Sequence, residues 1–513
     1  MIVRRRRTPV GFATLAALAV AVAILCSVPL LFVTWVAFDS GWAEVATLVF
    51  RPKVGELLVN TVLLLAITLP LAISLAVSFA WLVERTDLPG RGLWSWLMVA
   101  PLAVPAFVHS YAWSAFAPGF HGLWAAVAVS ILAYLPFLYL PVAASLRRLD
   151  PALEETAAAL GKPPMVVFFR IVLPQLRIAI WGGALLVALH LLAEYGLFVL
   201  TRFDTFATAI VDQFQSVYNG PAANLLGGVL VVACLVLLRA ESALRGDERY
   251  ARIGSGSIRR AERQSLGPLR WGAMGLVLIF TLFSLGVPLW TLSRWLWLGG
   301  AAIWRLDAVL PALGQTAALA LGAALLTTIA AFPIAWLSVR APSRSQRLLE
   351  AAHYYVGALP GVIVALALVT ITVRLAPSLY QTMATLVIAY MLMFLPRAVV
   401  GLRSSIAQAP PELERAASSL GKRPMVAIAR TTLRLAMPGA TASTAMVALG
   451  IANELTATLM LAPNGTRTLA MRFWAYTAEL DFSSAAPYAL LMIVLSLPLV
   501  VLLRFESRKI GQI

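Results

Sequence analysis

The sequence has little charge: only 12% of its 513 residues are Asp, Glu, Lys or Arg, whereas 61% are hydrophobic. One soluble core cannot hide so much apolar surface, and the apolar runs repeatedly reach the ~20 residues that cross a bilayer. Cysteine is almost absent, and Cys26 and Cys234 both lie inside apolar runs, which favours packing residues over a disulfide or a metal pair. The composition therefore predicts a polytopic membrane protein and does not indicate redox chemistry.

Motifs for catalysis and for nucleotide binding are missing as well. No stretch matches the phosphate-binding loop GxxxxGK[ST], and no nucleophile, base and orienting acid occur at a recognisable spacing. We therefore expect a protein that is not an enzyme, binds no cofactor itself, and depends on a separate subunit for any energy from ATP. The net charge of +17 does not indicate nucleic acid binding, because the basic residues cluster at the ends of apolar runs.

Twelve apolar runs are long enough to be membrane-spanning helices. Helices are expected rather than open sheets, because lipid offers backbone groups no hydrogen-bond partner. The positive-inside rule places both termini and most Lys and Arg residues on the cytoplasmic side. The predicted spans are residues 11–38, 57–83, 93–117, 122–146, 176–200, 222–239, 271–298, 312–339, 351–373, 379–402, 436–461 and 485–503.

The spans form two groups of six that repeat each other. The predicted halves are residues 1–239 and 271–513, joined by a polar, arginine-rich cytoplasmic linker at 240–270. Internal repeats of this kind are typical of transporters, and an even number of spans per half gives both copies the same topology. At a spacing of 255 residues, Thr61, Trp81, Arg85 and Pro105 recur as Thr316, Trp336, Arg340 and Pro360.

The clearest repeat is a short polar stretch on the predicted cytoplasmic side. Residues 153–170 and 413–430 are identical at ten of eighteen positions, at a spacing of 260 residues. Asp150 and Pro151 are typical of a helix start, and Gly161 is typical of a helix end in a left-handed conformation. The stretch therefore predicts a capped helix, a glycine break and a second amphipathic helix, an arrangement that suits a docking element for another protein.

This stretch resembles the EAA motif of ABC-importer permeases, in which Glu-Ala-Ala is followed by glycine and, further on, by Leu-Pro. In the second copy, Arg415 stands where the glutamate belongs and Arg434 replaces the proline, while Ala417 and Gly421 fit. In the first copy the fitting residues are Glu155, Ala157, Gly161, Ile171, Leu173 and Pro174.

The resemblance implies the fold of a type I ABC importer transmembrane domain. In that family the stretch is a coupling helix that inserts into a cleft on the ATPase subunit. The residues to which this role carries over are Leu153, Glu154, Glu155, Ala157, Gly161, Leu413, Glu414, Arg415, Ala417 and Gly421.

Two fused halves resemble the permeases for ferric iron and for thiamine. Residues Asn453 to Trp474 are similar to a Lys-Glu-Leu-Pro-Ala-Thr segment of ferric permeases, with departures at Asn453 and Thr456. The resemblance implies an inner-membrane permease for ferric iron, served by two copies of an ABC ATPase and by a periplasmic or lipid-anchored substrate-binding protein. The alternatives are a permease for thiamine or another small solute, and an ion-coupled secondary transporter, which has no need of matched docking helices.

Each half carries one glutamate in its fifth span, Glu194 or Glu454, and His190 lies one turn before the first of them. A charged carboxylate at mid-membrane costs about 2.5–3.5 kcal/mol on insertion scales, so each glutamate is expected to face protein or a water-filled cavity. Because ferric iron prefers oxygen ligands, these three residues are candidates for the pathway and for transient metal binding. The alternative is that each glutamate caps a helix end or pairs with an arginine such as Arg202 or Arg467.

The predicted periplasmic segments 201–221 and 462–484 are too short to form a receptor domain. They carry aromatic side chains that form a candidate docking surface for a binding protein: Phe203, Phe206, Tyr218, Phe473, Trp474 and Tyr476.

Overall fold

The computed structural model describes residues 12–39, 41–217, 219–245 and 263–509, and within them the chain is helical apart from turns and loops. In these ranges the extended backbone forms one isolated bridge, between Thr86 and Gln264. In the N-terminal half the helices are α1 (Phe12–Asp39), α2 (Gly41–Val49), α3 (Pro52–Arg85), α4 (Arg91–Leu97), α5 (Ala106–Phe116), α6 (Leu123–Arg148), α7 (Ala152–Ala159), α8 (Pro164–Val167), α9 (Leu173–Gln175), α10 (Arg177–Ala193), α11 (Gly196–Leu200), α12 (Phe206–Gln215) and α13 (Gly220–Arg245).

The C-terminal half continues the series. Its helices are α14 (Arg270–Thr281), α15 (Val287–Gly299), α16 (Leu306–Arg340), α17 (Arg344–Gly357), α18 (Gly361–Leu375), α19 (Met383–Gln408), α20 (Pro411–Ser419), α21 (Pro424–Ile428), α22 (Arg434–Ala452), α23 (Thr456–Leu461), α24 (Leu469–Ala478) and α25 (Phe482–Lys509). Short 3-10 helices are η1 (Ala100–Ala103), η3 (Gly267–Leu269), η5 (Gly300–Ile303) and η6 (Pro377–Leu379). The π-helices are η2 (Phe168–Val172), η4 (Leu282–Gly286) and η7 (Ala429–Leu433).

Every predicted span has a helical counterpart. Among the described residues, eight helices are long and apolar enough to cross a membrane, and each overlaps one of eight predicted spans. Two more spans correspond to helix pairs, Arg91–Ala103 with Ala106–Phe116 and Pro164–Gln175 with Arg177–Ala193, bent by 94° and 64°. The last two correspond to the shorter apolar helices Gly361–Leu375 and Phe482–Pro498. The all-α polytopic architecture is confirmed, and for these four segments the count of twelve crossings stays a prediction.

The third span of each half is broken, so the prediction of continuous helices at 93–117 and 351–373 is wrong. Helices α5 and α18 begin directly after Pro105 and Pro360. Proline lacks a backbone N–H and forces the preceding residue out of the helical region, which ends the earlier helix in both copies.

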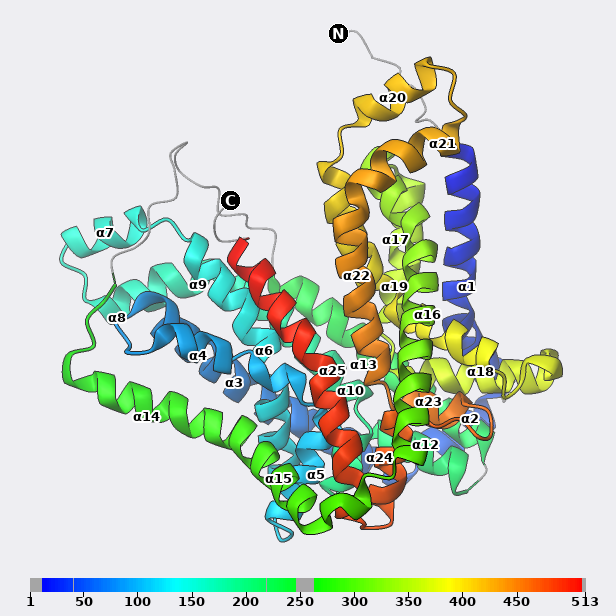
Figure 1. Cartoon of the computed structure of the whole chain (residues 1–513), viewed down its shortest axis with the longest axis horizontal. Helices are drawn as coiled ribbons and strands as arrows, with labels where there is room; N and C mark the ends of the chain where they lie inside the picture. Colours follow the sequence, from blue (N-terminus) through cyan, green and yellow to red (C-terminus); the bar gives the residue numbers. More distant parts are fainter. Residues whose placement is uncertain (1–11, 40, 218, 246–262, 510–513) are drawn as a thin grey trace. The chain divides into compact units, whose positions relative to one another are not determined.

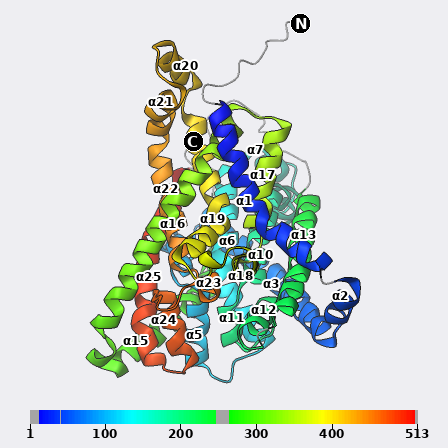
Figure 2. The same cartoon turned by 90° about the vertical axis from the view of Figure 1, so that its right-hand side faces the viewer.

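The described helices group into two compact units that cut across the predicted halves. Of the described residues, unit 1 comprises those within Met1–Val49, Ile210–Val231 and Arg305–Arg472, and unit 2 comprises those within Phe50–Ala209, Val232–Trp304 and Phe473–Ile513. In unit 1 the N-terminal helix α1 packs on α16, α17 and α18 of the C-terminal half (Figure 2). In unit 2, α15 packs on α5 and α25. The predicted division into residues 1–239 and 271–513 therefore describes the sequence repeat and stays a prediction. The boundaries between the two compact units lie at other residues.

Equivalent helices form the centre of each unit. Helices α16, α19 and α22 pack on one another in unit 1, as α3, α6 and α10 do in unit 2 (Figure 1). A Cβ atom added at Gly401 would lie 2.7 Å from the Ser443 hydroxyl oxygen, which shows how closely α19 and α22 approach. Small residues at such crossings are typical of membrane helices, because backbones must approach closely to gain contacts that lipid does not supply.

Candidate functional site

The two repeated polar stretches fold as predicted, each into a short helix. Helix α7 starts at the Asp150–Pro151 pair, where the Ala152 N–H donates to the Asp150 carboxylate at 3.0 Å. Helix α20 starts at Pro411. Both carry glutamates in the first turn, where the positive end of the helix dipole stabilises negative charge.

The glycine that ends each helix adopts the predicted left-handed conformation, with φ of +74° at Gly161 and +75° at Gly421. In the first copy, the Lys162 N–H donates to the Ala157 carbonyl at 3.1 Å and the Gly161 N–H donates to the Ala158 carbonyl at 2.9 Å. The second copy has the same two bonds at 3.2 and 3.0 Å. This pair of bonds is a Schellman motif, which satisfies the last carbonyls of a helix and turns the chain.

Each short helix exposes large apolar side chains. Leu160 and Leu420 are 74% and 80% exposed, and Leu153 and Leu413 are exposed as well. In Figure 1, α7 lies at the end of its helix bundle and α20 lies beyond the ends of α16, α19 and α22. Exposed apolar side chains on helices too short to span a membrane are typical of surfaces that contact another protein, so the coupling role predicted for these helices stays a prediction. Glu155 and Arg415 are exposed at equivalent positions, so the reversed charge of the second copy belongs to this surface.

Glu154 and Glu414 point the other way, although the sequence grouped them with the coupling residues. Glu154 forms an ion pair with Arg85 at 3.1 Å, and Glu414 forms one with Arg340 at 3.0 Å. Burial raises the pKa of the Glu154 carboxyl, an effect that the neighbouring Arg85 guanidinium partly offsets. Arg85 and Arg340 are themselves a repeated match in the sequence, and this match was a signal from which the two ion pairs could have been predicted.

The intramembrane glutamates cap helices. Glu194 follows α10 and accepts a hydrogen bond from the Leu197 N–H at 3.1 Å, at the start of α11. Glu454 does the same for α23, with the Ala457 and Thr458 N–H groups at 3.1 and 3.2 Å. The predicted continuous helices 176–200 and 436–461 are therefore wrong, because each is broken at its glutamate. The capping alternative is confirmed for both residues.

His190 lies within an aromatic cluster. Its ring stacks on Phe137 with centroids 4.6 Å apart and lies 5.4 Å from Tyr134, whose hydroxyl donates to Glu194. In the part of the chain that the structure describes, no three His, Cys, Asp or Glu side chains gather as metal ligands do. Glu194 and His190 belong to unit 2 and Glu454 to unit 1, so each is placed only within its own unit. Metal binding by these three residues stays a prediction.

The predicted aromatic docking surface is wrong for three of its six residues, while Trp474 and Tyr476 are half-buried and stay candidates. Phe203, Phe206 and Phe473 are buried, and the Phe473 ring lies 5.2 Å from that of Tyr111. These side chains therefore contribute to packing. Tyr218 lies outside the described residues.

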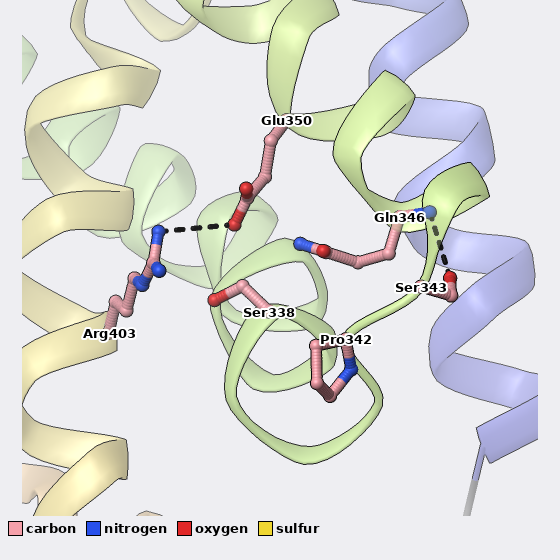
Figure 3. A pocket seen from close by; sticks show the side chains of 6 residues that line it. All are labelled: Ser338, Pro342, Ser343, Gln346, Glu350 and Arg403. Carbon is pink, nitrogen blue, oxygen red and sulfur yellow. Dashed lines mark hydrogen bonds and ion pairs between the residues drawn. The ribbon is translucent and has the colours of Figure 1, made fainter. Parts of the chain in front are cut away.

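Unit 1 contains a cavity of about 320 Å³ between α16, α17 and α19. Arg403 of α19 and Glu350 of α17 form an ion pair across it at 3.3 Å, and the Gln346 side chain points into it (Figure 3). One acid and one base that neutralise each other do not form a ligand set for a metal ion. The lining residues are Ser338, Pro342, Ser343, Gln346, Glu350 and Arg403.

A helical polytopic fold with two capped, apolar-tipped helices outside its spans is typical of a membrane permease. Residues 323–512 match the family described as binding-protein-dependent transport system inner membrane component. The chain is 34% identical over 478 residues to the Fe(3+)-transport system permease protein FbpB 2 of Haemophilus influenzae, which covers 92% of this chain and 94% of that relative. The chain therefore belongs to this family of permeases and has the type I permease fold.

Other relatives match a smaller part of the chain. The sulfate transport system permease protein CysT of Salmonella typhimurium is 26% identical over 44% of this chain and 88% of its own length. CysT of Escherichia coli is 28% identical over 32% of this chain and 67% of its own length. Family membership makes the chain a transport subunit of the inner membrane and argues against a secondary transporter.

Proposed function

We propose that this chain serves as both transmembrane domains of an ABC importer for ferric iron. The assignment of ferric iron as the substrate depends on the 34% identity to an Fe(3+)-transport permease across nearly the whole of both chains. The sulfate relatives match less than half of this chain, so they support the transport class more than the cargo. Thiamine or another small solute remains the second candidate, as the fused halves suggest.

Two copies of an ABC ATPase dock from the cytoplasm, one on α7 and one on α20. The exposed leucines of these helices and their matched Schellman caps support this assignment. A periplasmic or lipid-anchored binding protein delivers the substrate, and both termini lie in the cytoplasm. ATP binding and hydrolysis then switch the permease between outward and inward openings, while the chain itself binds no nucleotide.

Co-purification and transport test the proposal together. We expect the detergent-extracted chain to retain an ATPase subunit, and the reconstituted complex to take up iron only when an iron-loaded binding protein is supplied. If the complex retains the ATPase but takes up thiamine and not iron, the substrate is the second candidate and not ferric iron. A chain that never retains an ATPase would contradict the importer assignment itself.

A double substitution separates the capping and pathway roles of the intramembrane glutamates. In Glu194→Gln with Glu454→Gln, the amide oxygen still accepts the Leu197 N–H bond and one of the two N–H bonds that Glu454 accepts, so we expect most of the folded protein to remain. We propose that both carboxylates also line the pathway, so iron flux per folded molecule falls severalfold. The matching Glu→Ala pair also loses the caps, at about 1 kcal/mol each, and should lower the folded amount. Normal flux per molecule in the Gln pair would leave only the capping role.

Charge exchange tests whether the two docking surfaces are equivalent. If two identical ATPase clefts complement the motif glutamate, Glu155→Arg should weaken ATPase retention and Arg415→Glu should strengthen it. The effect should shrink as salt is raised, because both residues are exposed. Weaker retention by Arg415→Glu would instead mean that the second cleft is built for arginine.

A further inference from the structure

An ion pair ties each docking helix to a span that is remote in sequence. Arg85 is the last residue of α3 and contacts Glu154 of α7, and Arg340 is the last residue of α16 and contacts Glu414 of α20. All four side chains are at least 86% buried, since the most exposed of them, Glu154, has 14% of its side chain in contact with solvent. The same contact thus appears in both units, between the second span of a half and its docking helix.

Burial makes these pairs unlike ordinary surface ion pairs. Exposed pairs contribute little, whereas a buried charge that loses its partner is strongly destabilising. A pair of this kind therefore fixes one element against another more than it strengthens the fold. Its position at the C-terminal end of a helix adds a favourable interaction between arginine and the negative end of the helix dipole.

The ion pair connects each docking helix to a part of the chain that its other packing contacts do not reach. Helix α7 packs on α8 and η2, and α20 packs on α21 and η7, which are the segments that directly follow them. The Arg340–Glu414 pair instead joins residues 74 positions apart. A displacement of α20 is therefore transmitted to the end of α16 through Arg340. In the same way, a displacement of α7 is transmitted to the end of α3 through Arg85.

The second copy extends the pair into a network. Glu414 also accepts hydrogen bonds from the Trp336 indole at 3.4 Å and from the Thr432 hydroxyl, and Arg340 donates to the Ala409 carbonyl at 2.7 Å. Four elements, α16, α20, η7 and the end of α19, therefore meet at one carboxylate and its arginine. In the first copy the residue equivalent to Thr432 is Val172, so the α7 anchor has fewer bonds.

We propose that Arg85 and Arg340 are positioning residues for energy coupling, which make α3 and α16 the spans that the docking helices move. This inference rests on the proposed docking of ATPases on α7 and α20. The arginines touch neither ATP nor cargo; they set the position of the docking helix relative to the span, so that closure of the ATPases is transmitted into the membrane.

The test measures transported iron per ATP hydrolysed in reconstituted complexes. We expect Arg340→Gln to retain its ATPases and to hydrolyse ATP while the ratio falls about tenfold, within the usual range of coupling energies. The charge exchange Arg340→Glu with Glu414→Arg should recover part of the ratio, and Arg85→Gln should show the same type of defect. Arg403→Gln is the matched control, because it removes an ion pair in the same unit whose arginine is 50% exposed and which does not involve a docking helix, so it should leave the ratio unchanged.

The outcomes separate this proposal from the one on which it rests. If the wild-type complex retains no ATPase, the docking proposal fails. If it transports normally and Arg340→Gln has an unchanged ratio, or loses uptake only in proportion to folded protein, the coupling role of the anchor is wrong. Should Arg340→Gln not fold, Arg340→Lys decides: it keeps the charge but replaces the planar fork, which bonds Glu414 and Ala409 through two separate nitrogens, with a single ammonium group. We then expect a lower ratio of transported iron to hydrolysed ATP, and a normal ratio contradicts the proposal.

Discussion

Gly161→Pro combined with Gly421→Pro is expected to abolish iron uptake while leaving the amount of membrane-inserted protein nearly unchanged. Proline fixes φ near −65°, whereas these glycines have φ of +74° and +75°. The substitution also removes the N–H that closes each Schellman motif at the Ala158 or Ser418 carbonyl. The local cost is about 3 kcal/mol or more at each site. This cost affects the two docking helices and not the spans, so iron uptake should fall while the amount of inserted protein stays nearly the same.

Uptake by everted or reconstituted vesicles, normalised to folded permease, measures this result. Gly161→Ala with Gly421→Ala should give a weaker defect, because alanine reaches the left-handed region at a cost of roughly 1 kcal/mol. Gly182→Ala is the control: this glycine lies within α10 and an added Cβ meets nothing within 4 Å. Normal uptake by the double proline variant would show that the glycine breaks are not needed for coupling.

Leu160→Asp combined with Leu420→Asp is expected to remove the ATPase subunits from the purified complex. Both leucines are largely exposed, at 74% and 80%, so a charge there should not disturb folding. In a docked complex each leucine would be buried, which is worth about 1.5–3 kcal/mol per side chain, and an unpaired carboxylate in its place adds a desolvation cost. Together the two changes should lower ATPase retention by more than tenfold.

Size-exclusion chromatography of the detergent-extracted complex measures the retention. Leu269→Asp is a close control, because Leu269 is also 74% exposed but belongs to η3 and not to a docking helix. Full retention of the ATPases by the double variant would place the docking surface somewhere other than the tips of α7 and α20.

The features that could be predicted from the sequence are those that depend only on residues close together in the chain. Long apolar runs require helices in lipid whatever their partners, and each run has a helical counterpart. The glycine break of the docking helix was also predictable, because a Schellman motif involves residues within one turn of Gly161. For Glu194, the capping role and the pathway role were both compatible with the sequence, because the choice between them depends on where the helix breaks.

Composition and the internal repeat by themselves determined that this chain is a helical, duplicated membrane protein. They also determined its two matched, capped helices outside the spans, because these properties follow from hydropathy and from short-range caps. Only the tertiary structure decided that α1 packs on the helices of the other half and that the aromatic residues Phe206 and Phe473 are buried. It also decided which face of each docking helix turns inward, bringing Glu154 to Arg85 and Glu414 to Arg340. These contacts join residues about 70 positions apart, and the periodicity of a helix of eight or nine residues does not specify its remote partners.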